Sequence, residues 1–175
     1  KDLATDDPLA THALLLRARG CLARGAADRA ADLAARAASA PGFPEAGEAS
    51  LTRANALEAK GAWPEALLAL DAAHSATAAI EAGRLALRHG EREGARRRVA
   101  AALFGATASD DVDRLREAIE ELFPDPSTRL KPSERPQLAE RARHWLDEGR
   151  AKTALDLLRL VRPAAAPSAA TPAEA

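Results

Sequence analysis

The stretch that decides the fold is residues 51–70, which read Leu51-Thr-Arg-Ala54-Asn55-Ala-Leu57-Glu-Ala-Lys-Gly61-Ala-Trp63-Pro-Glu-Ala66-Leu-Leu-Ala-Leu70. It contains, in order, a small residue, an apolar residue, a glycine and a second small residue: Ala54, Leu57, Gly61 and Ala66. A glycine between two helix-forming stretches is typical of a left-handed helix C-cap. The order therefore predicts two helices joined at Gly61, with small residues where their backbones approach each other.

This frame occurs four times, around Gly25, Gly61, Gly90 and Gly149. Seven residues before these glycines stand Ala18, Ala54, Gly83 and Ala142. Four residues before them stand Cys21, Leu57, Ala86 and Trp145, and five residues after them stand Ala30, Ala66, Ala95 and Ala154. A frame repeated in this way predicts a series of antiparallel helical hairpins, each with a glycine at the end of its first helix.

Capping and breaking residues set the predicted helix limits. Asp7 before Pro8 suits a helix start, Ser75 suits an N-cap, and the prolines at 41 and 44 break the chain. The predicted helices of the first three hairpins span residues 8–24, 26–39, 45–60, 64–73, 76–89 and 91–104.

Composition narrows the fold class further. The 175 residues include 47 Ala and 24 Leu but only three Val and two Ile, so the residues that favour strands are almost missing. The formal net charge of -1 gives no electrostatic case for binding nucleic acid or anionic lipid. No apolar run approaches the roughly 18 residues of a membrane span. We expect an all-α protein without a membrane span.

Residues 51–70 resemble the 34-residue motif of the tetratricopeptide repeat family, and the stretches 14–41 and 137–161 resemble it next best. The resemblance implies a right-handed α-solenoid of stacked antiparallel hairpins with about nine helices. Three hairpins would occupy residues 1–105, and a final hairpin would occupy residues 137–162.

Residues 106–136 do not fit the repeat. Ser109 can cap a helix with an apolar stripe at Val112, Leu115, Ile119 and Leu122, and the Pro-rich stretch after it predicts an irregular loop. This helix either caps the third hairpin or belongs to a hinge between residues 1–123 and the last hairpin. Residues 163–175, rich in Ala and Pro, are expected to form a flexible tail.

The sequence predicts no catalytic, metal or cofactor site. Its four histidines, His12, His74, His89 and His144, are not spaced as metal ligands. Cys21 stands at the apolar position of the repeat, which favours a small buried residue over a nucleophile. The acidic residues 110, 111 and 113 suit the first turn of a helix, and the glycine of a calcium loop is missing.

Six arginines lie within 15 residues: Arg84, Arg88, Arg92, Arg96, Arg97 and Arg98. They form either a solvated face or part of a binding groove. In the tetratricopeptide family, the residue after the small residue of each first helix points into the concave groove. The resemblance therefore implies a peptide-binding set with Arg88 one helical turn further on, namely Arg19, Asn55, Arg84, Arg88 and Arg143.

Asn55 and Arg84 match two positions of the clamp with which some family members hold a terminal carboxylate. Arg19 and Ile80 depart from that clamp, so a strict carboxylate-tail binder is not implied. Arginine side chains still favour carboxylates through forked hydrogen bonds.

We expect a non-catalytic protein–protein interaction module that binds a peptide or protein segment, with an acidic one favoured, as part of a larger bacterial protein. Two alternatives stay open: a scaffold or sensory domain of an enzyme or regulator, and a structural subunit whose groove is filled by its own chain or another copy. The compartment is left open, because Lys1 starts a chain without Met and indicates a processed or excised product.

Overall fold

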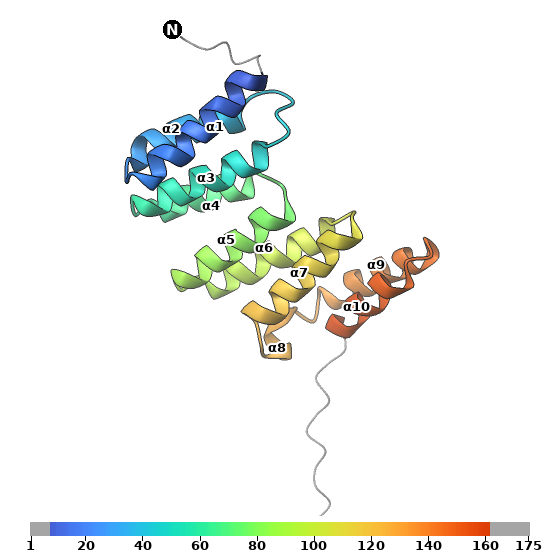
Figure 1. The fold of residues 1–175 in the computed structure, drawn as a ribbon. Helices are drawn as coiled ribbons and strands as arrows, with labels where there is room; N and C mark the ends of the chain where they lie inside the picture. Colours follow the sequence, from blue (N-terminus) through green and yellow to red (C-terminus); the bar gives the residue numbers. More distant parts are fainter. Residues whose placement is uncertain (1–7, 162–175) are drawn as a thin grey trace, which may run out of the picture. The chain divides into compact units, whose positions relative to one another are not determined.

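The computed structural model describes residues 8–161, and every regular element in that range is a helix (Figure 1). The helices are α1 (Pro8–Ala23), α2 (Ala27–Ala38), α3 (Ala46–Ala59), α4 (Trp63–Asp71), α5 (Ala76–Arg88), α6 (Arg92–Gly105), α7 (Ser109–Leu122), α8 (Pro126–Arg129), α9 (Arg135–Asp147) and α10 (Ala151–Val161). The all-α class is confirmed. The described part has ten helices instead of nine, because residues 126–129 add a single turn.

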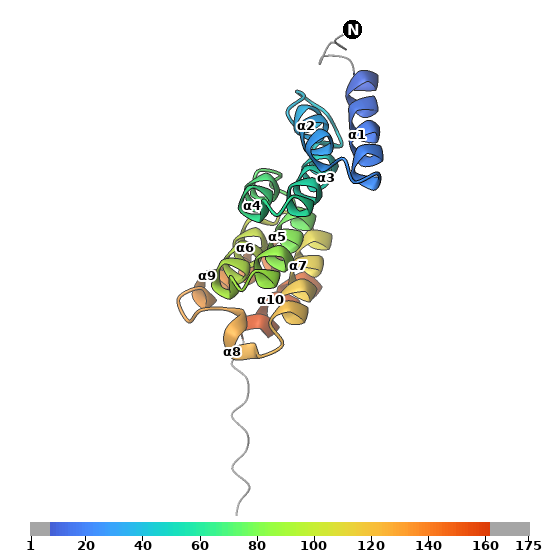
Figure 2. The same cartoon turned by 90° about the vertical axis from the view of Figure 1, so that its left-hand side faces the viewer.

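The described residues form two compact units, which divide between Ala102 and Leu103. In the first unit, successive helices pack against each other: α1 on α2, α2 on α3, α3 on α4 and α4 on α5 (Figures 1 and 2). In the second unit, α9 packs on α10, and α7 packs on α8 and α10. The division falls within the last turn of α6.

The turn at Gly61 connects α3 to α4. Gly61 has a φ of 77°, a left-handed conformation that costs other residues about 1–2 kcal/mol. Its amide donates to the carbonyl of Glu58 at 2.8 Å, and the amide of Ala62 donates to the carbonyl of Leu57 at 2.9 Å. This pair of bonds is the Schellman motif. The carbonyl of Ala62 then accepts from the amide of Ala66 at 3.1 Å, which is the first bond of α4.

The other three glycines of the frame make the same turn. Gly25, Gly90 and Gly149 have φ values of 76°, 80° and 77°. In each turn, the amide after the glycine donates to the carbonyl of the repeated apolar residue, at 2.9, 2.8 and 2.8 Å for Cys21, Ala86 and Trp145. The prediction that each glycine ends a helix in the left-handed conformation is confirmed.

The small residues of the frame are buried. All four alanines that follow the glycines by five residues are at most 2% exposed: Ala30, Ala66, Ala95 and Ala154. The four that precede the glycines by seven residues, Ala18, Ala54, Gly83 and Ala142, are buried as well. Alanine at these positions leaves little side-chain volume between neighbouring helices.

The two tryptophans have different surroundings. Trp145 is 2% exposed, and the guanidinium groups of Arg141 and Arg150 lie 5.9 and 4.7 Å from the centre of its ring. Trp63 is half-buried and stacks on His89, with ring centres 4.6 Å apart.

The caps and breaks of the helices agree only in part with the sequence-based predictions. Ser75 is the N-cap of α5, and its hydroxyl accepts from the amide of Ala78 at 3.2 Å. The capping role of Ser109 was wrong: α7 begins one residue earlier, with Ala108 as N-cap and no side-chain cap bond. Pro136 does not prolong the irregular stretch, because it occupies the first turn of α9. Asp7 and the expected tail, residues 163–175, lie outside the described residues.

The apolar stripe of α7 lies where the sequence placed it. Val112, Leu115 and Ile119 are buried, and Leu122 is half-buried. The helix packs on α10, so its stripe belongs to the core of the second unit.

Replacing Gly61 with alanine should lower the free energy of unfolding by about 1–2 kcal/mol, because a Cβ there meets no atom and the change acts only through the left-handed backbone. Chemical denaturation followed by circular dichroism measures this. Gly47→Ala is the matched control, since Gly47 lies in α3 with ordinary φ and equally open space. It should stabilise the protein by about 0.5–1 kcal/mol; equal losses in both variants would contradict the role given to the turn.

Trp145→Ala should lower the free energy of unfolding of the second unit by about 3–5 kcal/mol, because it empties a buried site. Trp63→Ala in the first unit should cost less than about 3 kcal/mol, since its ring is only half-buried. Thermal unfolding of the two variants compares these effects. The reverse order would show that the packing around the two rings has been misassigned.

Candidate functional site

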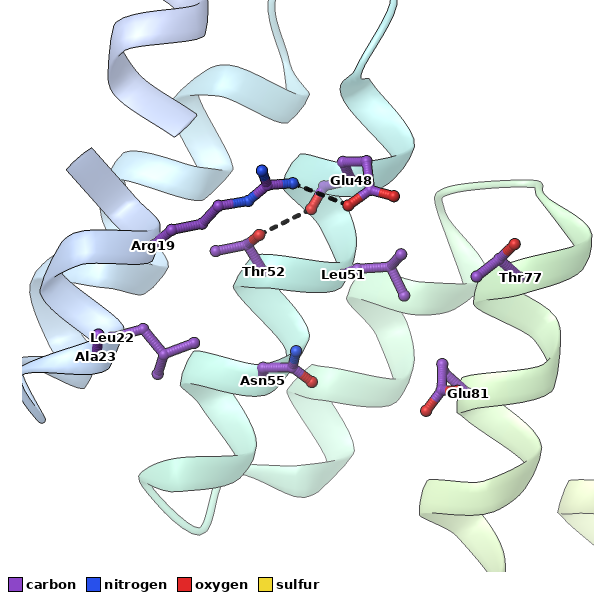
Figure 3. A pocket seen from close by; sticks show the side chains of 9 residues that line it. All are labelled: Arg19, Leu22, Ala23, Glu48, Leu51, Thr52, Asn55, Thr77 and Glu81. Atoms are coloured by element: carbon purple, nitrogen blue, oxygen red, sulfur yellow. Dashed lines mark hydrogen bonds and ion pairs between the residues drawn. The ribbon is translucent and has the colours of Figure 1, made fainter. Parts of the chain in front are cut away.

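A hollow of about 560 Å³ lies along α1, α3 and α5, the helices that end at Gly25, Gly61 and Gly90 (Figure 3). Its lining residues, all in the first unit, are Arg19, Leu22, Ala23, Glu48, Leu51, Thr52, Asn55, Thr77 and Glu81. We call this hollow the groove. It combines apolar, hydroxyl, amide and charged side chains, a mixture suited to binding rather than to a packed core.

Arg19 and Asn55 both line the groove. Arg19 reaches from α1 to Glu48 on α3, with 2.9 Å between Nη2 and Oε2 (Figure 3). The hydroxyl of Thr52 donates to the main-chain carbonyl of Glu48 at 2.9 Å. Glu48 therefore holds Arg19 across one wall of the groove.

Asn55 lies on the central helix of the groove. Because the preceding residue, Ala54, is buried, the side chain of Asn55 points towards solvent, between α1 and α5 (Figure 3). Within the described residues, no hydrogen bond to its carboxamide is recorded, and the residue is exposed. A carboxamide offers both donors and acceptors, so Asn55 can pair with an extended backbone.

Arg84 and Arg88 lie on α5 and are not among the lining residues. Arg84 donates to Glu81, a lining residue, at 2.8 Å. Arg88 makes a forked contact with the carboxylate of Glu58 on α3, at 2.8 and 2.9 Å from Nη2 and 3.1 Å from Nε. The two guanidinium groups therefore already hold carboxylates of the same unit.

Arg143 is exposed on α9 in the second unit, apart from the four candidates of the first unit. The remaining arginines of the cluster belong to α6. Arg96 is buried beside Glu93, with 3.0 Å between Nη2 and Oε1, and Arg98 contacts Asp71 at 3.1 Å. Four of the six arginines of the cluster, Arg84, Arg88, Arg96 and Arg98, thus form ion pairs with separate carboxylates.

Sequence reasoning missed the carboxylates that hold these arginines: Glu48, Glu58 and Glu81. A usable signal was present. Glu48 stands 29 residues after Arg19, and Arg88 stands 30 residues after Glu58, which is close to the length of one repeat. Charges of opposite sign one repeat apart can face each other on neighbouring helices.

The other potentially reactive side chains in the described residues are histidines and one cysteine. Among residues 8–161, no group of three or more His, Cys, Asp or Glu side chains could hold a metal ion. His12 lies 3.3 Å from Glu45, and His144 lies 3.1 Å from Glu148. Cys21 is a buried free thiol. None of the described helices has the length and apolarity needed to cross a membrane.

No family model, curated protein or solved structure matches this chain.

The Arg88–Glu58 pair should contribute only about 0.2–1 kcal/mol to stability, because both side chains are at least a third exposed to solvent. A double-mutant cycle with Arg88→Ala and Glu58→Ala measures this coupling by urea denaturation. Arg97→Ala, at an exposed arginine of α6, is the control for loss of one positive charge. A coupling above about 2 kcal/mol would mean that the pair is structural and unavailable for exchange with a ligand.

Proposed function

We propose that this chain is a non-catalytic protein–protein interaction module of the tetratricopeptide kind. In this proposal, the helices form antiparallel hairpins stacked into a right-handed α-solenoid, and α1, α3 and α5 line its concave face. The ligand is a peptide or protein segment that lies in the groove, and the module is part of a larger bacterial protein. The four identical glycine turns support the repeat architecture.

One observation carries the functional proposal: the exposed carboxamide of Asn55 at the centre of the groove, with no protein partner among the described residues. A polar group on the middle helix of a hollow can align an extended chain by hydrogen bonding to its backbone. The half-buried Leu22 and Leu51 line the same groove and can contact apolar side chains of that ligand.

The ion pairs around the groove supply specificity more than affinity. Each arginine of the first unit proposed for binding, Arg19, Arg84 or Arg88, contacts a carboxylate of its own unit. An acidic ligand would exchange one carboxylate for another, and exposed pairs contribute only about 0–1 kcal/mol. The charges therefore orient a ligand that Asn55 and the apolar lining hold. Among the described residues of the first unit, none fills the groove, which favours an external peptide over a self-filled structural role.

Asn55→Ala should weaken peptide binding about five- to tenfold, because it removes hydrogen bonds worth about 1–1.5 kcal/mol. Peptides selected from a random display library against the full chain serve as ligands, and fluorescence anisotropy gives their affinities. Gln137→Ala is the carboxamide control, since Gln137 is exposed in the second unit.

The double variant Arg84→Ala with Arg88→Ala tests the charged part of the same site. Peptides with acidic side chains should lose at most about fivefold in affinity, because exposed ion pairs contribute only about 0–1 kcal/mol, and neutral peptides should lose less. Binding of acidic peptides should also weaken as salt rises. If neither this variant nor Asn55→Ala changes any affinity, the groove is not the binding site.

A further inference from the structure

The outer face of α1 exposes a continuous apolar stripe. Leu9, Ala13, Leu16 and Gly20 follow each other at spacings of four, three and four residues, so they share one side of the helix. Leu9 is 80% exposed and Leu16 is 53% exposed. This stripe lies away from the groove, whose lining from α1 comprises Arg19, Leu22 and Ala23.

The repeat frame identifies what such a face does elsewhere in the molecule. Gly25 and Gly61 end α1 and α3 with the same turn, and they stand 36 residues apart. By that offset, Ala13, Leu16 and Gly20 of α1 correspond to Ala49, Thr52 and Ala56 of α3. These three residues of α3 are at most 6% exposed.

In α3, Ala49 and Ala56 of this face are covered by α2, whereas Thr52, also buried, lines the groove. Ala49 and Ala56 belong to one apolar cluster with Ala31 and Ala34 of α2, and the two helices pack against each other. On the corresponding face of α1, Leu16 is exposed and Ala13 and Gly20 are half-buried, so the described residues leave this face largely uncovered. The corresponding helix face is therefore packed against a neighbouring helix in α3 and largely uncovered in α1.

The open face is hollowed and positively charged. A depression of about 390 Å³ is lined by Leu16, Arg17, Gly20, Cys21, Arg24 and Arg29. Its three arginines are exposed, and none has an ion pair recorded within the described residues. A Cβ at Gly20 would lie 3.5 Å from Nη1 of Arg24, so this guanidinium borders the depression beside Gly20.

An ion pair between α2 and the end of α3 indicates which charge a partner should place opposite these arginines. Lys60, just after α3, forms an ion pair with Asp28 of α2. The hydrogen bond and charge of Asp28 raise the pKa of Lys60 above its ordinary value of 10.5. By the offset of 36 residues, Lys60 corresponds to Arg24. A helix bound to α1 as α2 is bound to α3 would bring its own carboxylate to Arg24.

We propose that the outer face of α1, formed by Leu9, Ala13, Leu16 and Gly20 and flanked by Arg17, Arg24 and Arg29, is a docking site for an acidic amphipathic helix of a protein partner. Its apolar side chains would enter the depression at three- and four-residue spacing. Its carboxylates would meet the arginines. We call this surface the α1 face.

A second copy of this chain is a poorer occupant. The outer side of α10 exposes Leu155 and Leu158, which correspond to Ala31 and Ala34 of α2 by the offset of 124 residues between Gly149 and Gly25. The residue of α10 that corresponds to Asp28, however, is Lys152. A copy docked in this way would place an ammonium against Arg24, and like charges at an interface oppose association.

The probe is a pair of labelled, terminally capped peptides based on residues 26–40, with leucine at the positions of Ala31 and Ala34. One peptide keeps the aspartates at positions 28 and 32, and the other has lysine at both. Anisotropy titrations with the full chain at low salt should show at least about tenfold tighter binding of the aspartate peptide. The difference should shrink at physiological salt. Equal affinities, or no binding of either peptide, would overturn the proposal.

Substitutions then locate the site. Leu16→Ser should weaken binding of the aspartate peptide at least about fivefold. Leu68→Ser should not, because Leu68 is a 68% exposed leucine on α4 of the same unit. Replacing Arg17, Arg24 and Arg29 by Glu should reverse the preference between the two peptides, whereas Arg97→Glu should leave it unchanged. A preference that survives the triple replacement would overturn the proposal.

Sedimentation velocity of the wild-type chain tests the other occupant. A monomer at micromolar concentration, unchanged by Leu16→Ser, supports a foreign helix. Self-association that Leu16→Ser abolishes would show that the α1 face binds a second copy, and would overturn the acidic-partner proposal. Asn55→Ala should leave binding at the α1 face unchanged, so this test is separate from that of the groove.

Discussion

The architecture depends on a single residue that serves two helices. After each of the glycines at positions 25, 61, 90 and 149, the next residue donates its amide to the helix behind it and accepts the first hydrogen bond of the helix ahead. With Ala62, both bonds lie within ten residues of the chain, from Leu57 to Ala66. No free linker remains between the helices, so the direction of the second helix is fixed by backbone geometry. The buried alanines then determine how closely the two helices pack.

The fold was predictable from sequence wherever a local rule decides the outcome. The glycine frame located four turns, and the scarcity of Val and Ile excluded sheets. The capping rule was wrong where two neighbouring residues could both be the N-cap. Ser109 has a side chain suited to an N-cap, but Ala108 is the N-cap of α7, so Ser109 lies in the first turn of that helix. The single turn α8 begins at a proline in a stretch that gave no periodic signal.

The groove was only partly predictable. Position within the frame placed Arg19 and Asn55 on one surface, because the small residue before each is held in the core. The carboxylates that occupy the arginines could not be identified from single helices, since Glu48 and Glu58 come from a neighbouring repeat. Pairing across helices depends on their relative displacement, which the turn geometry sets. The hollow beside Gly20 gave no signal either, because it becomes visible only when the faces of α1 and α3 are compared.

The closeness of these turns in sequence also bears on how the chain folds. Each Schellman turn is completed by bonds that span at most five residues, and most helix contacts join sequence neighbours. Loop-closure entropy is small for such contacts, and proteins dominated by them fold in microseconds to milliseconds. The first unit need not wait for distant segments to meet, so its helices can assemble as the chain emerges from the ribosome. An alanine-rich protein, whose small side chains bury little apolar area, can therefore still fold quickly.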